Sequence, residues 1–143
     1  MASIHRVSSG ERWIGRLERG DDLLGALSVI CRERDIRLGR VEAIGAVEKA
    51  VLGYYHQRKR EYEFFTLDGP REITALLGNV SLKDGEPMVH AHVMLSDGKG
   101  AVHGGHLAPG TVVFACEVVI EAFDGLSLER GMDEDTGLPL WKP

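Results

Sequence analysis

Beyond residue 39 the sequence is a series of short β-type segments separated by turn dipeptides, and this spacing strongly constrains the fold. The dipeptides are Asp84-Gly85, Asp97-Gly98 and Pro109-Gly110, which favour tight turns. The segments lie too close together for the crossover helices that parallel strands require, so we expect a mostly antiparallel sheet. The predicted strands are residues 40–46, 47–55, 63–67, 72–82, 87–95, 100–103 and 111–123, with a weaker candidate at 11–18.

One segment has helical rather than strand periodicity. Apolar residues recur at helical spacing from Leu23 to Cys31. Asp21 and Asp22 precede them and place negative charge at the positive end of the helix dipole. We therefore predict one main amphipathic helix packed on the sheet, which makes the fold class α+β. The chain is expected to be a single domain, residues 1–143, with a core at about 11–123 and a polar C-terminal tail at 124–143.

The composition argues against several classes of protein. Lys and Arg number 17 against 22 Asp and Glu, a net charge of −5, so the chain as a whole does not attract polyanions such as DNA. Cys31 and Cys116 lie in apolar runs and are expected to be buried free thiols, as in a reducing cytoplasm. No apolar run reaches the ~18 residues of a membrane-spanning helix, and residues 1–6 lack the pattern of a signal peptide. We therefore expect a cytoplasmic protein without a membrane partner.

Four of the six histidines fall within 17 residues, and their spacing predicts a metal site. The segment that carries His90 and His92 alternates with period two, so both are expected on one face of a strand. His106 follows Gly104 and Gly105, whose lack of side chains allows a close approach to that strand. These three histidines are predicted to bind one metal ion. The alternative is a set of hydrogen-bonded histidines at a subunit interface.

Three neutral imidazoles suit a divalent transition metal, with zinc as the expected ion, and leave one coordination position open. A hydrolase-type enzyme would use that position to activate water, whereas a small-molecule or metal sensor would bind there without turnover. Glu72 and Glu117 lie within apolar strands and are candidates for hydrogen bonds to histidine ring N–H groups. No catalytic residue is assigned. His103 is expected to point away from the site, and His5 and His56 to lie on the surface.

A cupin barrel is the alternative fold, because cupins also place His-x-His on a strand. Cupins require a glutamate a few residues after the second histidine. Here Met94, Leu95, Ser96 and Asp97 follow His92, so the cupin fold is not expected.

A set of sequence motifs spans nearly the whole chain. It consists of Ile44-Gly45-Ala46-Val47, Pro87-x-x-His90-x-His92, Gly104-Gly105-His106-Leu107, Gly110-Thr111-Val112-Val113 and Glu117-Val118-Val119-Ile120. Together these motifs resemble the plants and prokaryotes conserved (PPC) domain, which also occurs in plant AT-hook nuclear-localised proteins. The resemblance implies a compact α/β domain assembled as a homotrimer, with metal at His90, His92 and His106. It also implies a prokaryotic DNA-binding or regulatory protein.

The residues themselves give that DNA-binding role little support. The AT-hook with which the plant relatives grip the minor groove is absent from this sequence. Residues 69–74 keep only three of the six residues of the Gly-Arg-Phe-Glu-Ile-Leu stretch that the plant proteins use for partners. The remaining candidate for nucleic-acid contact is the basic stretch Arg58, Lys59 and Arg60, which follows two tyrosines. The alternative for this stretch is a solvated hairpin end.

Overall fold

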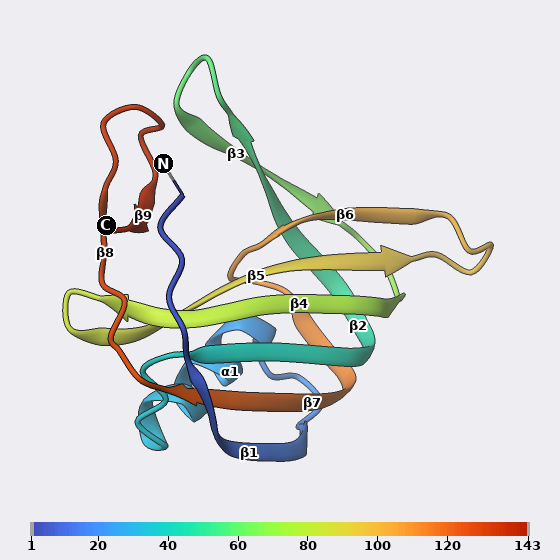
Figure 1. The fold of residues 1–143 in the computed structure, drawn as a ribbon. Coiled ribbons are helices and arrows are strands. Elements are labelled where there is room, and N and C mark those ends of the chain that lie inside the picture. Colours follow the sequence, from blue (N-terminus) through green and yellow to red (C-terminus); the bar gives the residue numbers. More distant parts are fainter. Residues whose placement is uncertain (1, 143) are drawn as a thin grey trace.

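Asp84-Gly85 and Asp97-Gly98 each separate two paired antiparallel strands, as the sequence predicts, whereas Pro109-Gly110 separates two strands that each pair with residues 39–56 instead. The computed structural model describes residues 2–142. Its elements are β1 (Ser8–Leu17), α1 (Leu23–Glu33), β2 (Gly39–His56), β3 (Glu61–Leu67), β4 (Arg71–Lys83), β5 (Glu86–Ser96), β6 (Val102–Leu107), β7 (Val112–Asp124), β8 (Arg130–Met132) and β9 (Pro139–Trp141). A seven-stranded antiparallel sheet has the order β1-β7-β2-β4-β5-β6, with β3 paired to β2, and β8 and β9 form a second small sheet (Figure 1).

Residues 40–46 and 47–55, predicted as two strands, form the single long strand β2. Its pairing with β4 and β7 shifts register close to Gly45. Gly45 has a φ of +146°, and the β7 backbone at Ala115 lies so close that a side chain here would clash with it. The later half of β2 leaves the main sheet and forms a projecting hairpin with β3 (Figure 1).

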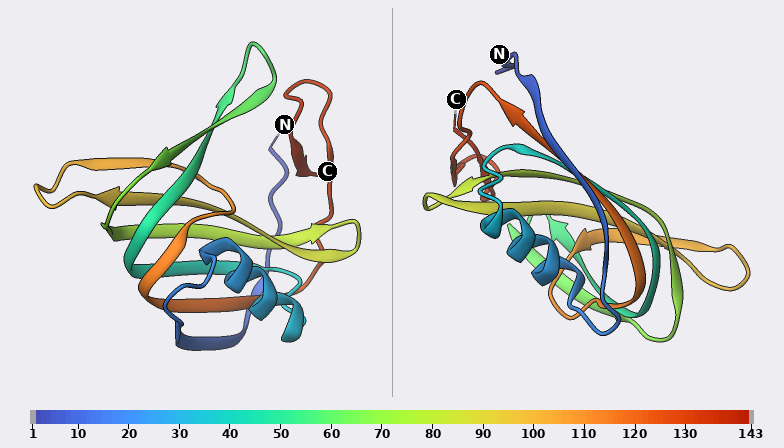
Figure 2. Two further views of the ribbon diagram at one scale, coloured as in Figure 1. Left: turned by 180° about the vertical axis from the view of Figure 1, so that it is seen from behind. Right: turned by 90° about the horizontal axis from the view of Figure 1, so that it is seen from below.

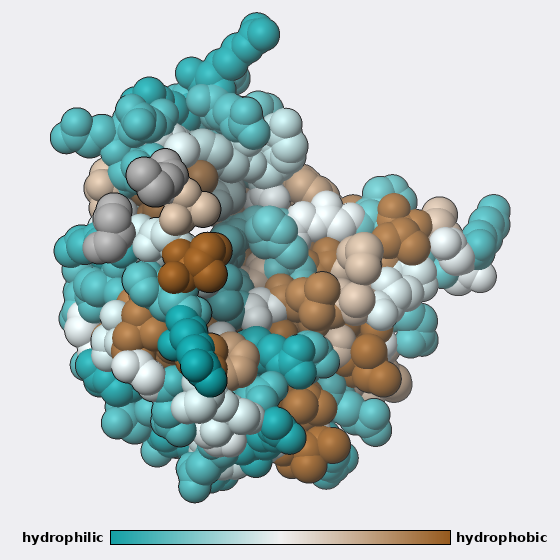
Figure 3. Space-filling model, in the orientation of Figure 1, coloured by the Kyte–Doolittle hydropathy of each residue, from teal (hydrophilic) through white to brown (hydrophobic). Residues whose placement is uncertain are grey.

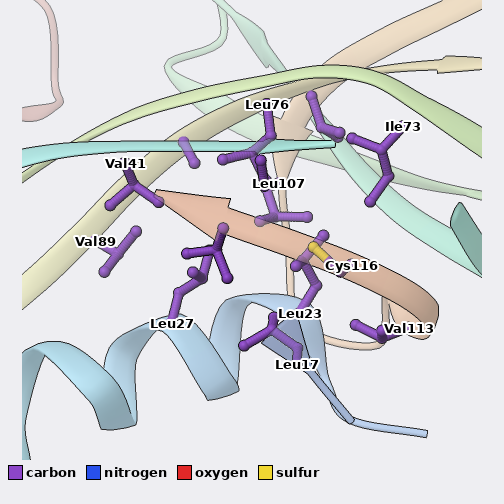
Figure 4. Close-up of a cluster of buried hydrophobic side chains, with 14 of the residues drawn as sticks. Leu17, Leu23, Leu27, Val41, Ile73, Leu76, Val89, Leu107, Val113 and Cys116 are labelled. Carbon is purple, nitrogen blue, oxygen red and sulfur yellow. The ribbon is translucent and has the colours of Figure 1, made fainter. Parts of the chain in front are cut away.

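The amphipathic helix α1 lies against one face of the sheet (Figure 2). Asp22 caps its N-terminus by accepting a hydrogen bond from the Gly25 N–H at 2.8 Å. Leu23, Leu27 and Cys31 are its buried residues, and Figure 4 shows the two leucines among apolar side chains of the strands. The predicted helix and its acidic start are therefore confirmed. Within residues 2–142, no helix has the length and apolar character needed to cross a membrane.

Both cysteines are buried free thiols, as predicted. Cys31 lies on the inner side of α1, and Cys116 lies on β7 in the same core (Figure 4). Burial raises the pKa of each thiol to about 11, so both stay protonated at neutral pH.

The alternation of side chains along the strands gives the sheet two different faces. On β5, Val89, Ala91 and Val93 are buried in the core beneath α1, whereas His90 and His92 project from the opposite face. The period-two prediction for this strand is thus confirmed. We call this opposite side the outer face, and apolar side chains are exposed across it (Figure 3). These include Ile14, Ile44, Leu77 and Val119.

The C-terminal residues, predicted as a polar tail at 124–143, are docked on the sheet instead. Arg130 is only 8% exposed. Its guanidinium donates hydrogen bonds to Ser81 Oγ at 2.9 Å and to Asn79 Oδ1 at 2.7 Å. Trp141 packs on the same guanidinium and donates its indole N–H to Ser81 Oγ at 3.0 Å. A buried cation that finds its partners on β4 therefore holds the end of the chain in place.

Replacing Leu27 by Ala tests the core between α1 and the sheet. Leu27 is fully buried, so its truncation should lower the free energy of unfolding by about 2–5 kcal/mol. Denaturant unfolding measures this change. Val29→Ala on the exposed side of the same helix is the control, and we expect it to change the free energy by less than about 1 kcal/mol. Equal effects of the two variants would contradict the packing described here.

Candidate metal centre

Three histidine side chains meet on the outer face where β5 pairs with β6. His90 and His92 are two residues apart on β5, and His106 lies directly opposite His92 on β6. One ring nitrogen from each lies within 4.8 Å of those of the other two. The three ring centroids are 5.1–5.7 Å apart. The three histidines that the sequence places in one cluster therefore do lie together.

Glycines allow β6 to come close enough for this meeting. A Cβ at Gly104 would lie 3.0 Å from the Val93 carbonyl oxygen of β5. A Cβ at Gly105 would lie 3.0 Å from the carbonyl oxygen of Gly53 on β2. The strand predicted at residues 100–103 stops short of these glycines, but β6 includes Gly104, Gly105 and His106 because it pairs with β5 on one side and with the end of β2 on the other. The predicted close approach to β5 is therefore present, and the strand β6 makes it.

The surroundings keep at least two of these imidazoles neutral. Burial, followed by the neighbouring His106, Arg130 and His92, lowers the pKa of His90 from 6.5 to about 4. Burial and His92 also lower the pKa of His106. A neutral imidazole retains the lone pair that binds a metal ion. The Nδ1 atom of His106 is buried and has no hydrogen-bond partner within residues 2–142, so its lone pair is available to a ligand.

The histidines form part of the lining of a pocket of about 640 Å³. One wall comes from the β2–β3 hairpin and includes Tyr54, Tyr55 and Tyr62. The Tyr62 ring lies 4.9 Å from the His106 ring. Burial and the nearby Tyr55 raise the pKa of Tyr62, so its phenol is neutral. Sequence reasoning missed Tyr62 because the predicted strand began at residue 63, one position after it.

A second wall of the pocket comes from the C-terminal turn, residues 133–138. The Tyr55 hydroxyl donates a hydrogen bond to the Thr136 carbonyl at 2.7 Å. Arg60 donates to the carbonyls of Glu134 and Asp135 at 2.9 and 3.1 Å. The turn is thus fastened to the β2–β3 hairpin. No motif in the sequence predicts this contact between the hairpin and the C-terminal turn, because the two segments are about 75 residues apart.

The structure does not bring the two predicted carboxylates to the histidines. Glu72 lies at the start of β4, opposite Ser96, and Glu117 lies on β7 opposite Ile44. Both are exposed and neither lines the pocket. The premise that they are buried in apolar strands does not hold, because both side chains point to the solvated side of the sheet.

The other histidines lie outside the cluster, as expected. His103 is exposed on β6 opposite Leu95. His5 is exposed near the N-terminus. His56 is partly buried at the end of β2, where its ring contacts the Glu63 carboxylate.

The basic stretch occupies the tip of the β2–β3 hairpin, but its cations are not equally free. The Arg60 guanidinium is engaged by the C-terminal turn, as described above. Lys59 lies 3.8 Å from the Glu61 carboxylate. Arg58 is exposed, and no hydrogen bond or ion pair of its side chain is found within residues 2–142.

Comparison with known proteins identifies relatives for the whole fold. The sequence model of the family described as "Plants and Prokaryotes Conserved (PCC) domain" matches residues 4–124. The crystal structure of a metal-containing protein from Archaeoglobus fulgidus is 43% identical, with a TM-score of 0.93 over 99% of this chain and 100% of that one. A plant- and prokaryote-conserved (PPC) protein from Pyrococcus horikoshii is 36% identical, with a TM-score of 0.93 over 99% and 98%.

Two further likenesses bear on function. A structure from Ralstonia eutropha JMP134 named "Putative DNA-binding protein" is 26% identical, with a TM-score of 0.80 over 91% of this chain and 90% of that one. The bifunctional protein GlmU of Synechococcus sp. strain JA-3-3Ab is 32% identical over 124 residues, or 85% of this chain. This chain spans about a fifth of the length of the GlmU proteins that it matches.

Proposed function

Because this chain belongs to the Plants and Prokaryotes Conserved (PCC) domain family, we propose that it is a metal-binding member of it, holding one divalent transition ion at His90, His92 and His106. The observation that carries this proposal is the convergence of three ring nitrogens within 4.8 Å. The buried, unpartnered Nδ1 of His106 supports it, as does the metal-containing relative from Archaeoglobus fulgidus. Zinc is the expected ion, because neutral imidazole is among its preferred ligands.

The protein residues around the cluster favour binding over hydrolysis. A bound ion would supply a Lewis acid that polarises an oxygen ligand and lowers the pKa of a bound water to about 7. A proton acceptor beside that ligand would assist hydrolysis, but Glu72 and Glu117 lie elsewhere on the sheet, and the acidic residue in the lining, Asp135, belongs to the C-terminal turn. Tyr62, the nearest aromatic neighbour of His106, is a neutral phenol. We therefore propose a site that recognises a ligand, as a sensor does, ahead of a metal-dependent hydrolase.

The outer face supports the further proposal that the chain assembles as a homotrimer. Ile14 is 86% exposed, Leu77 61% and Ile44 57%, and these three residues line one shallow depression of the sheet, which Glu42 and Glu117 line as well. Apolar residues gathered on one face in this way mark a surface that associates. A second copy of the same chain is the partner that the family resemblance implies.

DNA binding is the second candidate function, favoured by the relative from Ralstonia eutropha. The β2–β3 hairpin places Arg58 and Lys59 at a projecting tip beside exposed Tyr54. Three copies of this tip in a trimer would bind DNA more tightly than a single tip does. Against it stand the net charge of −5 and the engagement of Arg60 within the fold. We propose that any such binding is weak and electrostatic.

The metal proposal predicts about one equivalent of transition metal per chain after incubation with zinc and dialysis. Elemental analysis of protein purified without chelator or nickel resin measures it. His106→Ala should lose the bound zinc, because two imidazoles and water hold the ion far less tightly. His103→Ala, an exposed histidine on the same strand, is the matched control and should keep it. Less than about a tenth of an equivalent in the zinc-treated native protein would refute the proposal.

The assembly proposal predicts a sedimentation mass of three chains. Replacing both Ile14 and Ile44 by Glu should shift the protein to the mass of one chain, because charges on the outer face oppose its burial. Val29→Glu on the exposed side of α1 should leave the assembly unchanged. A native protein that sediments as a single chain at every concentration would contradict the proposal.

The DNA proposal predicts a dissociation constant above about 1 μM for an AT-rich duplex at physiological salt, with strong weakening as salt rises. Removing Arg58 and Lys59 together should abolish the residual binding. Removing Arg32 and Arg34 at the end of α1 changes the net charge equally and should have little effect. Tight binding that survives the loss of Arg58 and Lys59 would contradict both the strength and the place of contact.

A further inference from the structure

The pocket beside the three histidines has one aromatic wall and one wall from the C-terminal turn. We propose that it binds a small molecule that carries a metal-binding oxygen group and a planar ring, with the ring packed against Tyr62. This inference rests on the proposed metal site, because the oxygen group would take the open coordination position. Tyr62 is the residue that selects the ligand, through contact with its planar ring.

The size and lining of the pocket fit a small molecule. Its volume of about 640 Å³ lies within the usual range of ligand sites, roughly 300–1,000 Å³. Tyrosine rings and Leu138 provide apolar surface, and the histidines lie together at one place in the lining. A large apolar surface with a few convergent polar groups is the usual composition of such sites. A nucleic-acid duplex, by contrast, is far too wide to enter it.

The aromatic wall is held in place before any ligand arrives. The Tyr62 ring packs at 4.9 Å from His106 and at 5.0 Å from Tyr55, and it stacks on Phe64 at 5.7 Å. Gly53 on β2 leaves room for these rings, because a Cβ there would lie 3.2 Å from Tyr62 Cδ1. A ring fixed by packing on several sides loses little freedom on binding, which favours stacking of a planar group.

The opposite wall is equally well fixed. The three hydrogen bonds from Tyr55 and Arg60 hold the carbonyl groups of residues 134–136 against the hairpin. Asp133 holds the turn from inside by accepting from the Thr136 N–H at 2.9 Å and from its hydroxyl. Because these contacts use up Arg60, the pocket presents no free guanidinium from it, and Asp135 adds an acidic side chain to the lining. Apart from the proposed metal ion, the lining therefore offers a polyphosphate ligand no cation from Arg60.

Two hydroxamates that share one metal-binding group test this proposal. Benzohydroxamate carries a phenyl ring, and acetohydroxamate carries a methyl group in its place. Calorimetric titration into the zinc-loaded full-length protein should show benzohydroxamate binding at least about tenfold more tightly, since its ring adds buried aromatic contact. Tyr62→Ala should remove most of that difference when the variants are compared at equal zinc content, measured by elemental analysis. Tyr62→Phe keeps the ring and should keep the difference.

Phe65→Ala is the matched control, because Phe65 lies on the same strand and does not line the pocket. It should leave the affinities of both probes unchanged. The inference would be wrong if the zinc-loaded native protein bound the two probes with equal affinity. It would also be wrong if Tyr62→Ala kept the full preference for benzohydroxamate. Neither result would contradict the proposed metal site. Native protein that takes up no zinc would instead overturn the proposed function and this inference with it, and elemental analysis separates the two cases.

Discussion

The close packing of β6 against its neighbouring strands decides where the functional site can be. Gly104 lies against the β5 backbone, and Gly105 lies against the carbonyl oxygen of Gly53, the β2 residue that pairs with His106. A side chain at Gly104 or Gly105 would crowd these backbones. His106 reaches His90 and His92 only because β6 is this close. Gly53 also leaves the space in which the Tyr62 ring lies, so the same glycines position the metal ligands and the aromatic wall.

The two faces of the sheet have different roles, one in stability and the other in the proposed function. The inner face packs against α1 and supplies the apolar core of the protein. Within residues 2–142 no helix covers the outer face. A row of paired residues crosses it from Ile14 through Val119, Glu42 and Leu77 to His92. In this row exposed apolar side chains, interrupted by Glu42, lead to the histidine cluster. The proposed association of subunits and the proposed metal site therefore share one face, which links the oligomeric state to the surroundings of the site.

Local patterns in the sequence predicted the parts of this structure that depend on local geometry. Period-two alternation placed His90 and His92 on one face, and the acidic pair before Leu23 marked the start of α1. Contacts between distant segments carry no such local signal. Arg130 looked like part of a polar tail, yet it is buried because Asn79 and Ser81 on β4 satisfy its guanidinium. Tyr62 and the C-terminal turn reach the site through tertiary packing alone. Glu72 lies on the strand next to β5, but the register pairs it with Ser96 at the end of β5, away from the pocket.

Crystals of the zinc-loaded protein, measured on both sides of the zinc absorption edge, would show whether the three histidines hold a metal ion. We expect one anomalous peak per chain, bonded to nitrogens of His90, His92 and His106 at about 2.0–2.1 Å, with a further position open toward the Tyr62 wall. A peak held by other residues, or three histidines hydrogen-bonded to one another or to a neighbouring subunit with no peak between them, would contradict it.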